Sequence, residues 1–278
     1  MIILAHDGSL YGDWVARYAL NFAVAETDRK LLALHVLDGK TSQELVTSKF
    51  AQLETACRNR GIDFIPQLLP LDSGVYRSLR HAIPHAPEAL LVCGTRIKAK
   101  KRTFLRGSVA EQLLRCHQCP VLALRVVQPG LLGSPRHLLM PLAGHVSGFP
   151  RVWPIFQRLS VNLQRVHLFR SLHVRQLRHA YLNPARQRRL LSAGEAYLEK
   201  IFAEMSAHLP EQRFSVERQA MISSDWPNAV LIQASRLKVQ MILLGVSERN
   251  LAHRTFYGVG IERVLRETPC DVGIYRGP

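Results

Sequence analysis

The chain has 278 residues, a length that suits one large domain or two of ordinary size. Its 37 lysines and arginines outnumber its 21 aspartates and glutamates, which gives a formal net charge of +16 and an attraction to polyanions. Hydrophobic residues make up 47%, as in a globular protein, and charges interrupt every apolar run before it reaches the length of a membrane span. We therefore expect no membrane insertion. Because no basic region with a cleavage site opens the chain, we expect the protein in the cytoplasm.

Apolar runs alternate with amphipathic helices through the first half of the chain. A buried strand is expected at its start, followed by the turn Asp7-Gly8-Ser9 and then a helix. The strands expected in this half cover residues 2–5, 31–37, 64–69, 89–93 and 121–126, and the helices cover residues 14–23, 42–60, 73–83 and 109–114. This alternation predicts a parallel sheet that is covered by helices on both faces.

A linker rich in glycine and proline, Gln128 to Arg136, leads into a second half with the same pattern. Its strands are expected at residues 137–142, 166–172, 214–220, 240–244 and 272–275, and three of its helices at residues 152–163, 184–208 and 225–235. Asn183 and Ser224 are expected to cap the last two of these helices. We therefore expect two domains, residues 1–127 and residues 137–278.

The same motif ends both halves, in one register. Residues 90–125 correspond to residues 241–276 at a constant offset of 151. The matched pairs include Gly94 and Gly245, Gly107 and Gly258, Glu111 and Glu262, Cys119 and Cys270, and Arg125 and Arg276. A constant register over so many positions indicates an internal duplication.

The motif of the first half suits a phosphate. Its strand ends at Gly94, where a missing side chain lets a ligand approach the backbone. Gly107-Ser108 opens a helix whose N–H groups and dipole favour an anion. Six basic side chains lie between the two glycines: Arg96, Lys98, Lys100, Lys101, Arg102 and Arg106. We expect this loop to cover an anion site at the carboxyl ends of the strands, and to order when an anion binds.

These residues resemble the universal stress protein family, whose nucleotide loop has a glycine, two residues, a glycine, nine residues, and then glycine with serine or threonine. Gly94 and Gly107-Ser108 match this spacing, and Ile97 stands where the second glycine is expected. The opening IILAHDGS resembles the family's first strand, and LLALHV resembles its second. The resemblance covers nearly the whole chain. It implies two tandem, doubly wound α/β domains with parallel five-stranded sheets, of the adenine-nucleotide alpha hydrolase type, packed as an intramolecular pseudo-dimer.

The resemblance also implies a stress-response binding module rather than an enzyme, with ATP or another adenine nucleotide in the first domain. Asp7 would accept hydrogen bonds from the base or ribose, although it could equally cap its own turn. His6 could face the ligand or only end the strand. The residues expected to line the site are Ala5, His6, Asp7, Val36, Cys93, Gly94, Ile97, Gly107, Ser108 and Val109.

The second copy lacks the side chains that this ligand needs. Ala143 stands where Asp7 stood, and Val259 replaces the hydroxyl of Ser108. Glu248 lies where a glycine is expected, and its charge would repel a phosphate. We therefore expect the second half to be structural and to bind no ATP.

No catalytic or metal-binding set is expected. An enzyme of nucleotide chemistry needs a general base or metal-binding carboxylates, and the acids near the loops are Asp7 and Glu111. Cys116 and Cys119 form a C-x-x-C motif, but no second pair of suitable spacing completes a zinc site. Cys119 is expected to be a small buried residue, with a redox pair as the alternative.

The basic charge leaves another function open. A scaffold without a nucleotide, or a polyanion- or nucleic-acid-binding protein, would also have basic clusters such as Lys98–Arg102 and Arg186–Arg189. Because no nucleic-acid motif with interleaved aromatic residues is present, non-specific attraction is expected first. The other expected partners are the chain's own two halves, through Val121–Val126 and Val272–Tyr275, and a second copy in a homodimer.

Overall fold

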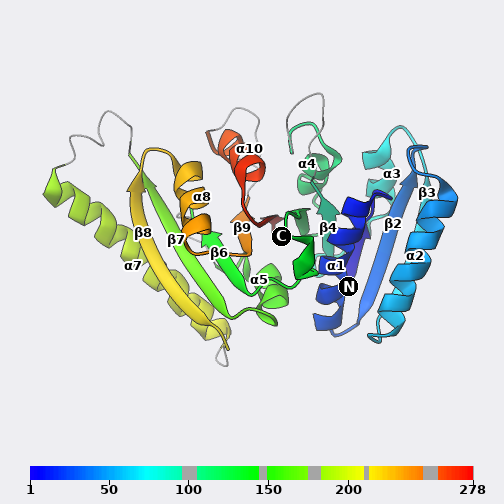
Figure 1. Ribbon diagram of the computed structural model, residues 1–278, viewed down its shortest axis with the longest axis horizontal. Helices are drawn as coiled ribbons and strands as arrows, with labels where there is room; N and C mark the ends of the chain where they lie inside the picture. The colour runs from blue at the N-terminus through cyan, green and yellow to red at the C-terminus, as the bar shows by residue number, and fades with distance from the viewer. Residues whose placement is uncertain (96–104, 144–148, 175–182, 210–212, 247–255, 278) are drawn as a thin grey trace. The chain divides into compact units, whose positions relative to one another are not determined.

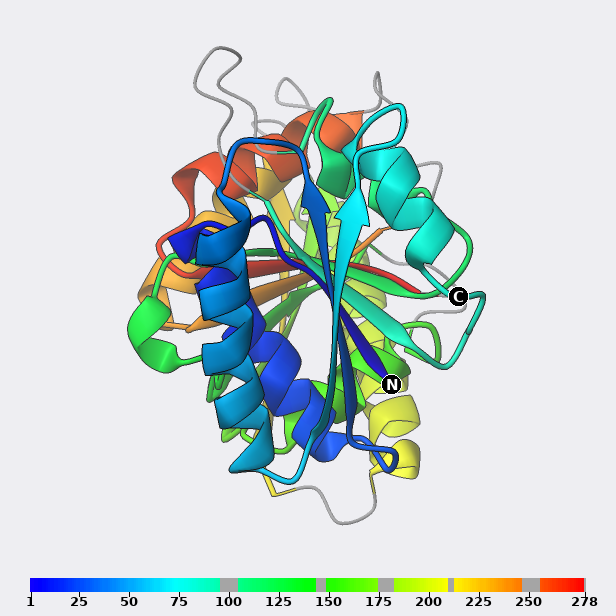
Figure 2. The ribbon, with the colours of Figure 1, turned by 90° about the vertical axis from the view of Figure 1, so that its right-hand side faces the viewer.

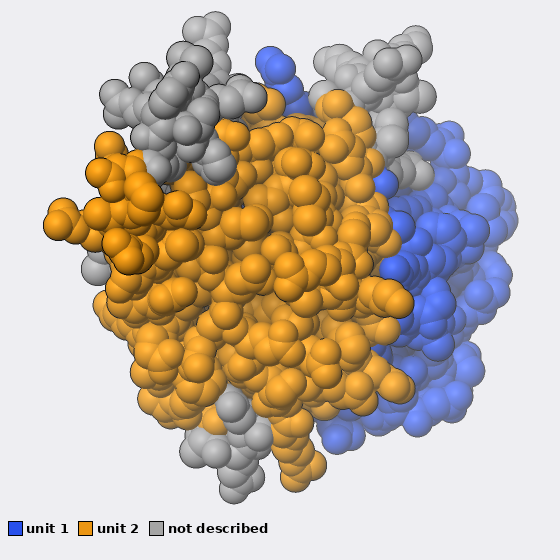
Figure 3. Space-filling view, turned by 60° about the vertical axis from the view of Figure 1, so that its left-hand side comes forward, with its two compact units in different colours: residues 1–134, 246–251, 273–278 blue, residues 135–245, 252–272 orange. Residues whose placement is uncertain are grey.

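The computed structural model describes residues 1–95, 105–143, 149–174, 183–209, 213–246 and 256–277. These residues form an α/β fold with ten strands (Figure 1). The chain divides into two compact units, residues 1–134, 246–251 and 273–278 in the first and residues 135–245 and 252–272 in the second (Figure 3). The domain limits expected from the sequence stay predictions, because a compact unit need not fold on its own.

The described part of residues 1–134 contains five strands in the order β3-β2-β1-β4-β5. Every pair of neighbours in this order is parallel. The strands are β1 (Ile2–Ala5), β2 (Lys30–Leu37), β3 (Asp63–Pro70), β4 (Leu90–Gly94) and β5 (Val121–Arg125). The central strands are continuous apolar runs because both of their faces are covered, and Ile2, Ile3 and Leu4 are fully buried.

Helices cover both faces of this sheet. They are α1 (Leu10–Ala25), α2 (Gln43–Arg58), α3 (Val75–Ala82) and α4 (Val109–Leu114), with a 3-10 turn at Pro129–Leu131. Figure 2 shows α1 and α2 on one side of the strands and α3 and α4 on the other. The first unit is therefore doubly wound, as the sequence predicted.

Serine side chains begin three of these helices. Ser9 caps α1 by accepting from the Gly12 N–H. In the same way Ser42 caps α2 by accepting from the Leu45 N–H, and Ser108 caps α4 by accepting from the Glu111 N–H. Each hydroxyl satisfies one backbone donor that has no partner inside its helix. The N-cap of α1 fixes the turn that follows β1, and this turn lies at the candidate site.

The second unit repeats the arrangement with the order β9-β6-β7-β8, again with parallel pairs where register is defined. Its strands are β6 (His137–Pro141), β7 (Arg165–His173), β8 (Ser215–Ser223) and β9 (Met241–Gly245), followed by β10 (Asp271–Arg276), whose last residues group with the first unit. Its helices are α5 (Trp153–Ser160), α7 (Pro184–His208), α8 (Trp226–Arg236) and α10 (Phe256–Glu267). The predicted strands and helices of this half are present, with shifted ends.

Of the two helix caps predicted in the second unit, one is confirmed and one is wrong. Asn183 caps α7 as predicted, by accepting from the Ala185 N–H. The predicted cap Ser224 is wrong, because the carboxylate of Asp225 accepts from the Asn228 N–H at the start of α8. Pairing of the two halves as a pseudo-dimer stays a prediction.

None of the helices in the described part of the chain is both long and apolar enough to cross a membrane.

Candidate functional site

The candidate site lies where the central strands of the first unit end. In register, Ala5 of β1 lies opposite Leu34 of β2 on one side and Cys93 of β4 on the other. The order of the strands reverses between β1 and β4, and ligands of doubly wound sheets bind at such a point. The register therefore brings the ends of β1, β2 and β4 to one edge, with five of the predicted residues. They are Ala5, His6, Val36, Cys93 and Gly94.

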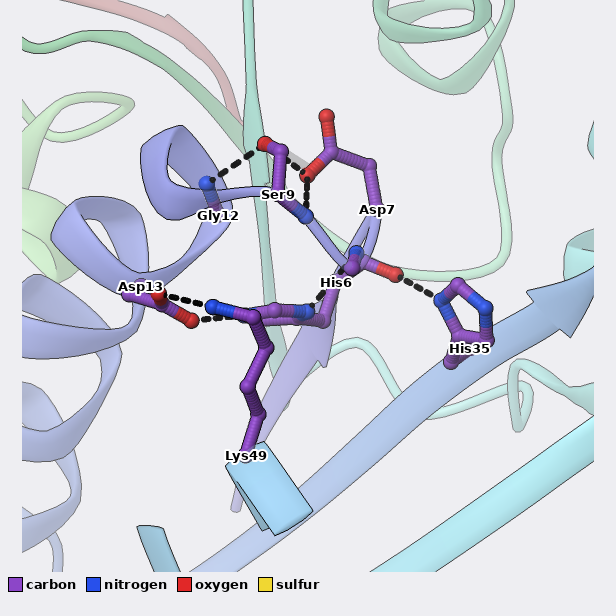
Figure 4. A network of polar contacts seen from close by, with 8 residues as sticks. His6, Asp7, Ser9, Gly12, Asp13, His35 and Lys49 are labelled. Atoms are coloured by element: carbon purple, nitrogen blue, oxygen red, sulfur yellow. Dashed lines mark hydrogen bonds and ion pairs between the residues drawn. The ribbon is translucent and has the colours of Figure 1, made fainter. Parts of the chain in front are cut away.

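His6 directly follows β1 and is buried. Its Nδ1 accepts from the Gly8 N–H at 3.0 Å, and its Nε2 lies 3.1 Å from Oδ1 of Asp13 (Figure 4). Because an amide donates to Nδ1, the proton of a neutral His6 lies on Nε2 and is donated to Asp13. Both ring nitrogens therefore hold the turn, and a ligand could bind either one only by breaking a bond.

Asp13 links His6 to helix α2. Its second carboxylate oxygen accepts from the ammonium group of Lys49, so His6, Asp13 and Lys49 form one chain of contacts (Figure 4). Burial raises the pKa of Asp13, but hydrogen bonds and charges from His6 and Lys49 outweigh burial and lower it below its usual value. The carboxylate is thus held ionised between its two donors.

Asp7 caps the turn that it begins. Its Oδ1 accepts from the backbone N–H of Ser9 at 3.0 Å and from the Ser9 hydroxyl at 2.5 Å. A Cβ atom at Gly12 would lie 2.7 Å from the same oxygen, so only glycine fits beneath the carboxylate without displacing it. Of the two interpretations of Asp7, capping is present in the structure, and contact with a nucleotide stays a prediction.

A tyrosine side chain approaches Gly94 closely. A Cβ atom at Gly94 would lie 3.0 Å from Cε1 of Tyr11. The Tyr11 hydroxyl donates to the Leu124 carbonyl at 3.2 Å and accepts from the Val126 N–H at 2.7 Å. Packing against Tyr11 is therefore a sufficient reason for a glycine at the end of β4, beside the ligand approach predicted from the sequence.

Gly107 and Ser108 begin α4 as predicted, and their polar groups bond within the chain. Gly107 has φ +68°, no atom of the described residues lies within 4 Å of its missing Cβ, and its N–H donates to Oε2 of Glu111 at 2.6 Å. The Ser108 hydroxyl accepts from the Glu111 N–H at 3.1 Å and donates to the Leu105 carbonyl. Glu111 also accepts from Arg115 at 3.1 Å. A phosphate at this helix start would have to displace the Glu111 carboxylate. Because Glu111 already accepts from Gly107 and Arg115, its carboxylate is engaged and not poised as a general base.

The rest of the predicted loop can be placed only in part. Ile97 lies outside the described residues, as do five of the six basic side chains of the loop, Arg106 being the exception. Val109 is half-buried in the first turn of α4. The expected lid over an anion therefore stays a prediction.

Four residues of this region were missed as site residues by reasoning from the sequence: Tyr11, Asp13, His35 and Lys49. His35 offered a signal, because it is a titratable residue inside an apolar strand. Its Nδ1 donates to the His6 carbonyl at 2.8 Å, while its buried Nε2 has no partner in the described part of the chain. The others offered none, since Lys49 lies 36 residues from Asp13 and Tyr11 lies 113 residues from Leu124.

The cysteines of the first unit are buried thiols. Burial raises the pKa of Cys93 to about 12 and that of Cys119 to about 11, so neither is a thiolate at neutral pH. Cys116, the partner of Cys119 in the C-x-x-C motif, has its Sγ 2.9 Å from Oε1 of Gln118. Among the described residues, no group of three or more histidine, cysteine or acidic side chains is arranged to hold a metal ion.

The corresponding edge of the second unit differs chemically. Ala143 and Val259 are exposed at the positions that match Asp7 and Ser108, and Glu248 lies outside the described residues. A buried histidine is nevertheless present: Nδ1 of His167 lies 3.2 Å from Oε2 of Glu217 on the neighbouring strand. Burial lowers the pKa of His167, and Glu217 only partly opposes this shift. The absence of a nucleotide here stays a prediction.

Comparison with known proteins identifies the fold. A universal stress protein from Archaeoglobus fulgidus shares 14% identity over 98% of this chain and 94% of its own, with a TM-score of 0.54. A Pseudomonas aeruginosa protein provisionally assigned to the same group shares 16% identity over 99% of this chain and 92% of its own, with a TM-score of 0.58. The cytoplasmic domain of a prokaryotic cation chloride cotransporter shares 9% identity over 99% of this chain and 95% of its own, with a TM-score of 0.59.

No family model and no curated protein matches the sequence. The likenesses therefore rest on structure at low identity, and they show the fold alone. Because two of these structures are described as universal stress proteins and match over nearly their whole length, the chain has the fold of a tandem universal stress protein.

Proposed function

We propose that the protein is a stress-response binding and signalling module of the universal stress protein type, that it works in the cytoplasm, and that its first unit binds an adenine nucleotide weakly. The proposal is carried by one observation: residues that match the family's nucleotide motif, Asp7, Gly94 and Gly107-Ser108, lie at the carboxyl edge and the α4 start of a unit with that fold. The left-handed backbone at Gly107, with no described residue within 4 Å of its missing Cβ, suits the close approach of a phosphate.

Weak rather than tight binding is expected because the groups concerned already have partners. A phosphate would exchange with Glu111 for the Gly107 N–H, and a ribose or base would exchange with Ser9 at Asp7. Each exchange breaks one hydrogen bond of the protein to form one with the ligand. The net gain in binding free energy is therefore small, since even a hydrogen bond that replaces a bond to water contributes only about 1 kcal/mol. Discrimination and affinity would then depend on residues that close over the ligand.

The same contacts support a binding module rather than an enzyme. Glu111 is held by Gly107 and Arg115, and Asp13 is held by His6 and Lys49. A general base must reach the proton that it abstracts, and these acids are directed at donors of their own chain. We therefore assign no catalytic residue.

A scaffold that binds no nucleotide is the second candidate, and two observations favour it. Tyr11 packs against Gly94, and Glu111 occupies the Gly107 N–H. The cytoplasmic domain of the cotransporter shows that a protein of another class has a similar fold. The two candidates differ in one measurable property, the affinity of the purified chain for adenine nucleotides.

The test is calorimetric titration of the purified chain with ATP, together with mass spectrometry of small molecules released from it. We expect weak binding that Asp7→Ala and Gly107→Val abolish. Asp63→Ala, a matched change of an exposed acid at the opposite end of the sheet, should leave binding unchanged. Binding that survives both site variants would contradict the assigned site, and no binding by any form would leave the scaffold as the function.

A further inference from the structure

Helix α7 extends well past the sheet that it covers. It has 25 residues, against 16 in α2, which follows the corresponding strand of the first unit. Its buried residues begin only at Gly194 and continue with Leu198, Ile201 and Met205. None of the ten residues before Gly194 is buried. At 1.5 Å per residue, this segment, residues 184–193, is about 15 Å long, and we call it the overhang.

Gly194 marks the place where the helix leaves the sheet. A Cβ atom there would lie 2.9 Å from Cδ1 of Leu172 and 2.9 Å from Cβ of Ala220. Leu172 is the penultimate residue of β7, which ends at His173, so the helix touches the strands near their carboxyl ends. Figure 1 shows the first turns of α7 at the far left, past β8. The overhang therefore presents most of its surface to solvent.

The overhang is strongly basic. Arg186, Arg188 and Arg189 are exposed, and its sequence PARQRRLLSA contains no acid. None of the three guanidinium groups pairs with a carboxylate in the described part of the chain. The helix dipole opposes a cation in the first turn of a helix, where Arg186 lies. Because none of the three arginines has an ion pair among the described residues, their charge is available to a partner.

The arginines also lie on the outer side of the helix. At about 100° per residue, Leu190 and Leu191 continue the buried stripe of Gly194 and Leu198, and both are half-buried. Arg186 and Arg188 fall on opposite flanks of this stripe, and Arg189 lies near the middle of the outer side. The other exposed side chains of the outer side are small, Ala185, Ser192 and Ala193. A partner can therefore approach the helix closely beside the arginines.

This surface suits one of three common anionic partners best. A membrane-surface helix enters the lipid with large apolar side chains, and a protein interface is typically anchored by aromatic or large apolar residues. The outer side of the overhang has neither. It has charge and small residues, which suit a phosphodiester backbone, and arginine binds phosphate oxygens with two donors at once.

We propose that the overhang of α7 binds double-stranded DNA by placing its outer side in the major groove, with the arginine side chains reaching the phosphates along the groove. An α-helix with its side chains is about 10–12 Å across, and the major groove of B-form DNA is about 12 Å wide. The deep, narrow major groove of A-form RNA does not admit a helix. The contacts are to phosphates, so binding is independent of base sequence. This inference does not rest on nucleotide binding by the first unit.

The test measures fluorescence anisotropy of a labelled mixed-sequence DNA duplex of about 20 base pairs, titrated with the full chain over a salt series. The test variant is Arg186→Gln/Arg188→Gln/Arg189→Gln. The control variant is Arg17→Gln/Arg77→Gln/Arg80→Gln, which removes the same charge from exposed positions of α1 and α3. Glutamine keeps a helix propensity close to that of arginine, and circular dichroism checks that both variants fold.

We expect the test variant to bind DNA at least tenfold more weakly at about 50 mM salt. Each phosphate contact contributes about 0.9 to the slope of log K against log salt, so three lost contacts should reduce the slope by about 2.7. The control variant should retain most of the affinity for DNA and most of the salt slope. Equal losses in the two variants would mean diffuse attraction and would overturn the proposal. So would overhang-dependent binding to duplex RNA, anionic vesicles or polyglutamate that equals or exceeds binding to DNA.

Discussion

His6, Asp13 and Lys49 show how single residues shape the edge of the first unit. A buried histidine needs partners for both ring nitrogens, and here one partner is the backbone of its own turn and the other is a carboxylate from the next helix. Lys49 then balances the charge of that carboxylate. The contacts join β1, α1 and α2, so the turn that contains Asp7 is held from three elements (Figure 4).

This network predicts a pH dependence of stability. Because its donors lower the pKa of Asp13 in the folded state, Asp13 contributes stability above its unfolded pKa of about 4. That contribution is lost as the pH falls through the lower, folded pKa. We expect Asp13→Asn to lower the free energy of unfolding by about 1 kcal/mol at pH 7, a modest value because the carboxylate is partly exposed.

The measurement is urea unfolding of the wild type and of Asp13→Asn at pH 7 and near pH 3, monitored by a spectroscopic signal that reports on the first unit. The difference between the wild type and Asp13→Asn should shrink at the lower pH. Asp63→Asn, at an exposed acid with no ion pair among the described residues, should show no such change. A difference that is constant over this pH range would mean that Asp13 acts by shape alone.

Individual polar contacts were the part of the site that the sequence could not predict. The glycines and Ser108 were predictable, since Gly107 has positive φ and Ser108 caps the helix that follows it. The partners of Asp13 and Gly94 were not, because Lys49 and Tyr11 are close to them only after the sheet and its covering helices have formed. A motif indicates where a site lies and leaves open which groups already occupy it.

At the scale of elements, Tyr11 connects the start of α1 to the end of β5. Its hydroxyl donates to the Leu124 carbonyl, which also accepts from the Thr95 N–H, and it accepts from the Val126 N–H just past the end of β5. A side chain thus provides the acceptor for the Val126 N–H. Because its ring also covers Gly94, the same residue holds the end of β4.

We expect Tyr11→Phe to destabilise the first unit by about 1–3 kcal/mol, because the variant keeps the ring but leaves the buried Val126 N–H without its acceptor. Tyr76→Phe on α3 is the matched control, since no hydrogen bond of the Tyr76 hydroxyl is present in the described residues. Hydrogen exchange of the β5 amides measures the effect. Unchanged protection in Tyr11→Phe would show that another donor or acceptor replaces the hydroxyl.

The strands and helices themselves were largely predictable. Parallel strands that are buried on both faces become continuous apolar runs, which is why β1, β4 and β9 were visible in the sequence. The apolar stripe of α7 was visible because a helix that covers a sheet buries one side with a period of 3.6 residues. The overhang was not, because Leu190 and Leu191 continue the stripe past the place where the sheet ends, and only the contacts of Gly194 reveal that end.

At the scale of the whole molecule, the chain does not divide at a single point. Residues 273–278 group with the first unit, although the segment before them belongs to the second. Arg276 explains this grouping chemically. Its buried guanidinium donates to the carbonyl oxygens of Cys116 and Cys119, which follow α4 in the first unit. The end of the last strand of the second copy, residues 273–276, therefore belongs to the first unit.

Arg276→Met should therefore weaken the first unit specifically. Methionine fills a similar volume without donors, so the carbonyls of Cys116 and Cys119 lose a charged partner, and hydrogen bonds of this kind contribute about 1.5–3 kcal/mol. Because a chain with two units need not unfold in one step, the measurement is hydrogen exchange resolved by peptide, with α4 and β5 compared with α8. We expect exchange to rise in α4 and β5 and to stay constant in α8. Arg266→Met, at an exposed position of α10, is the control and should change neither. If Arg276→Met raised exchange equally in α8, the arginine would stabilise the whole chain, and the end of the chain would not be a specific part of the first unit.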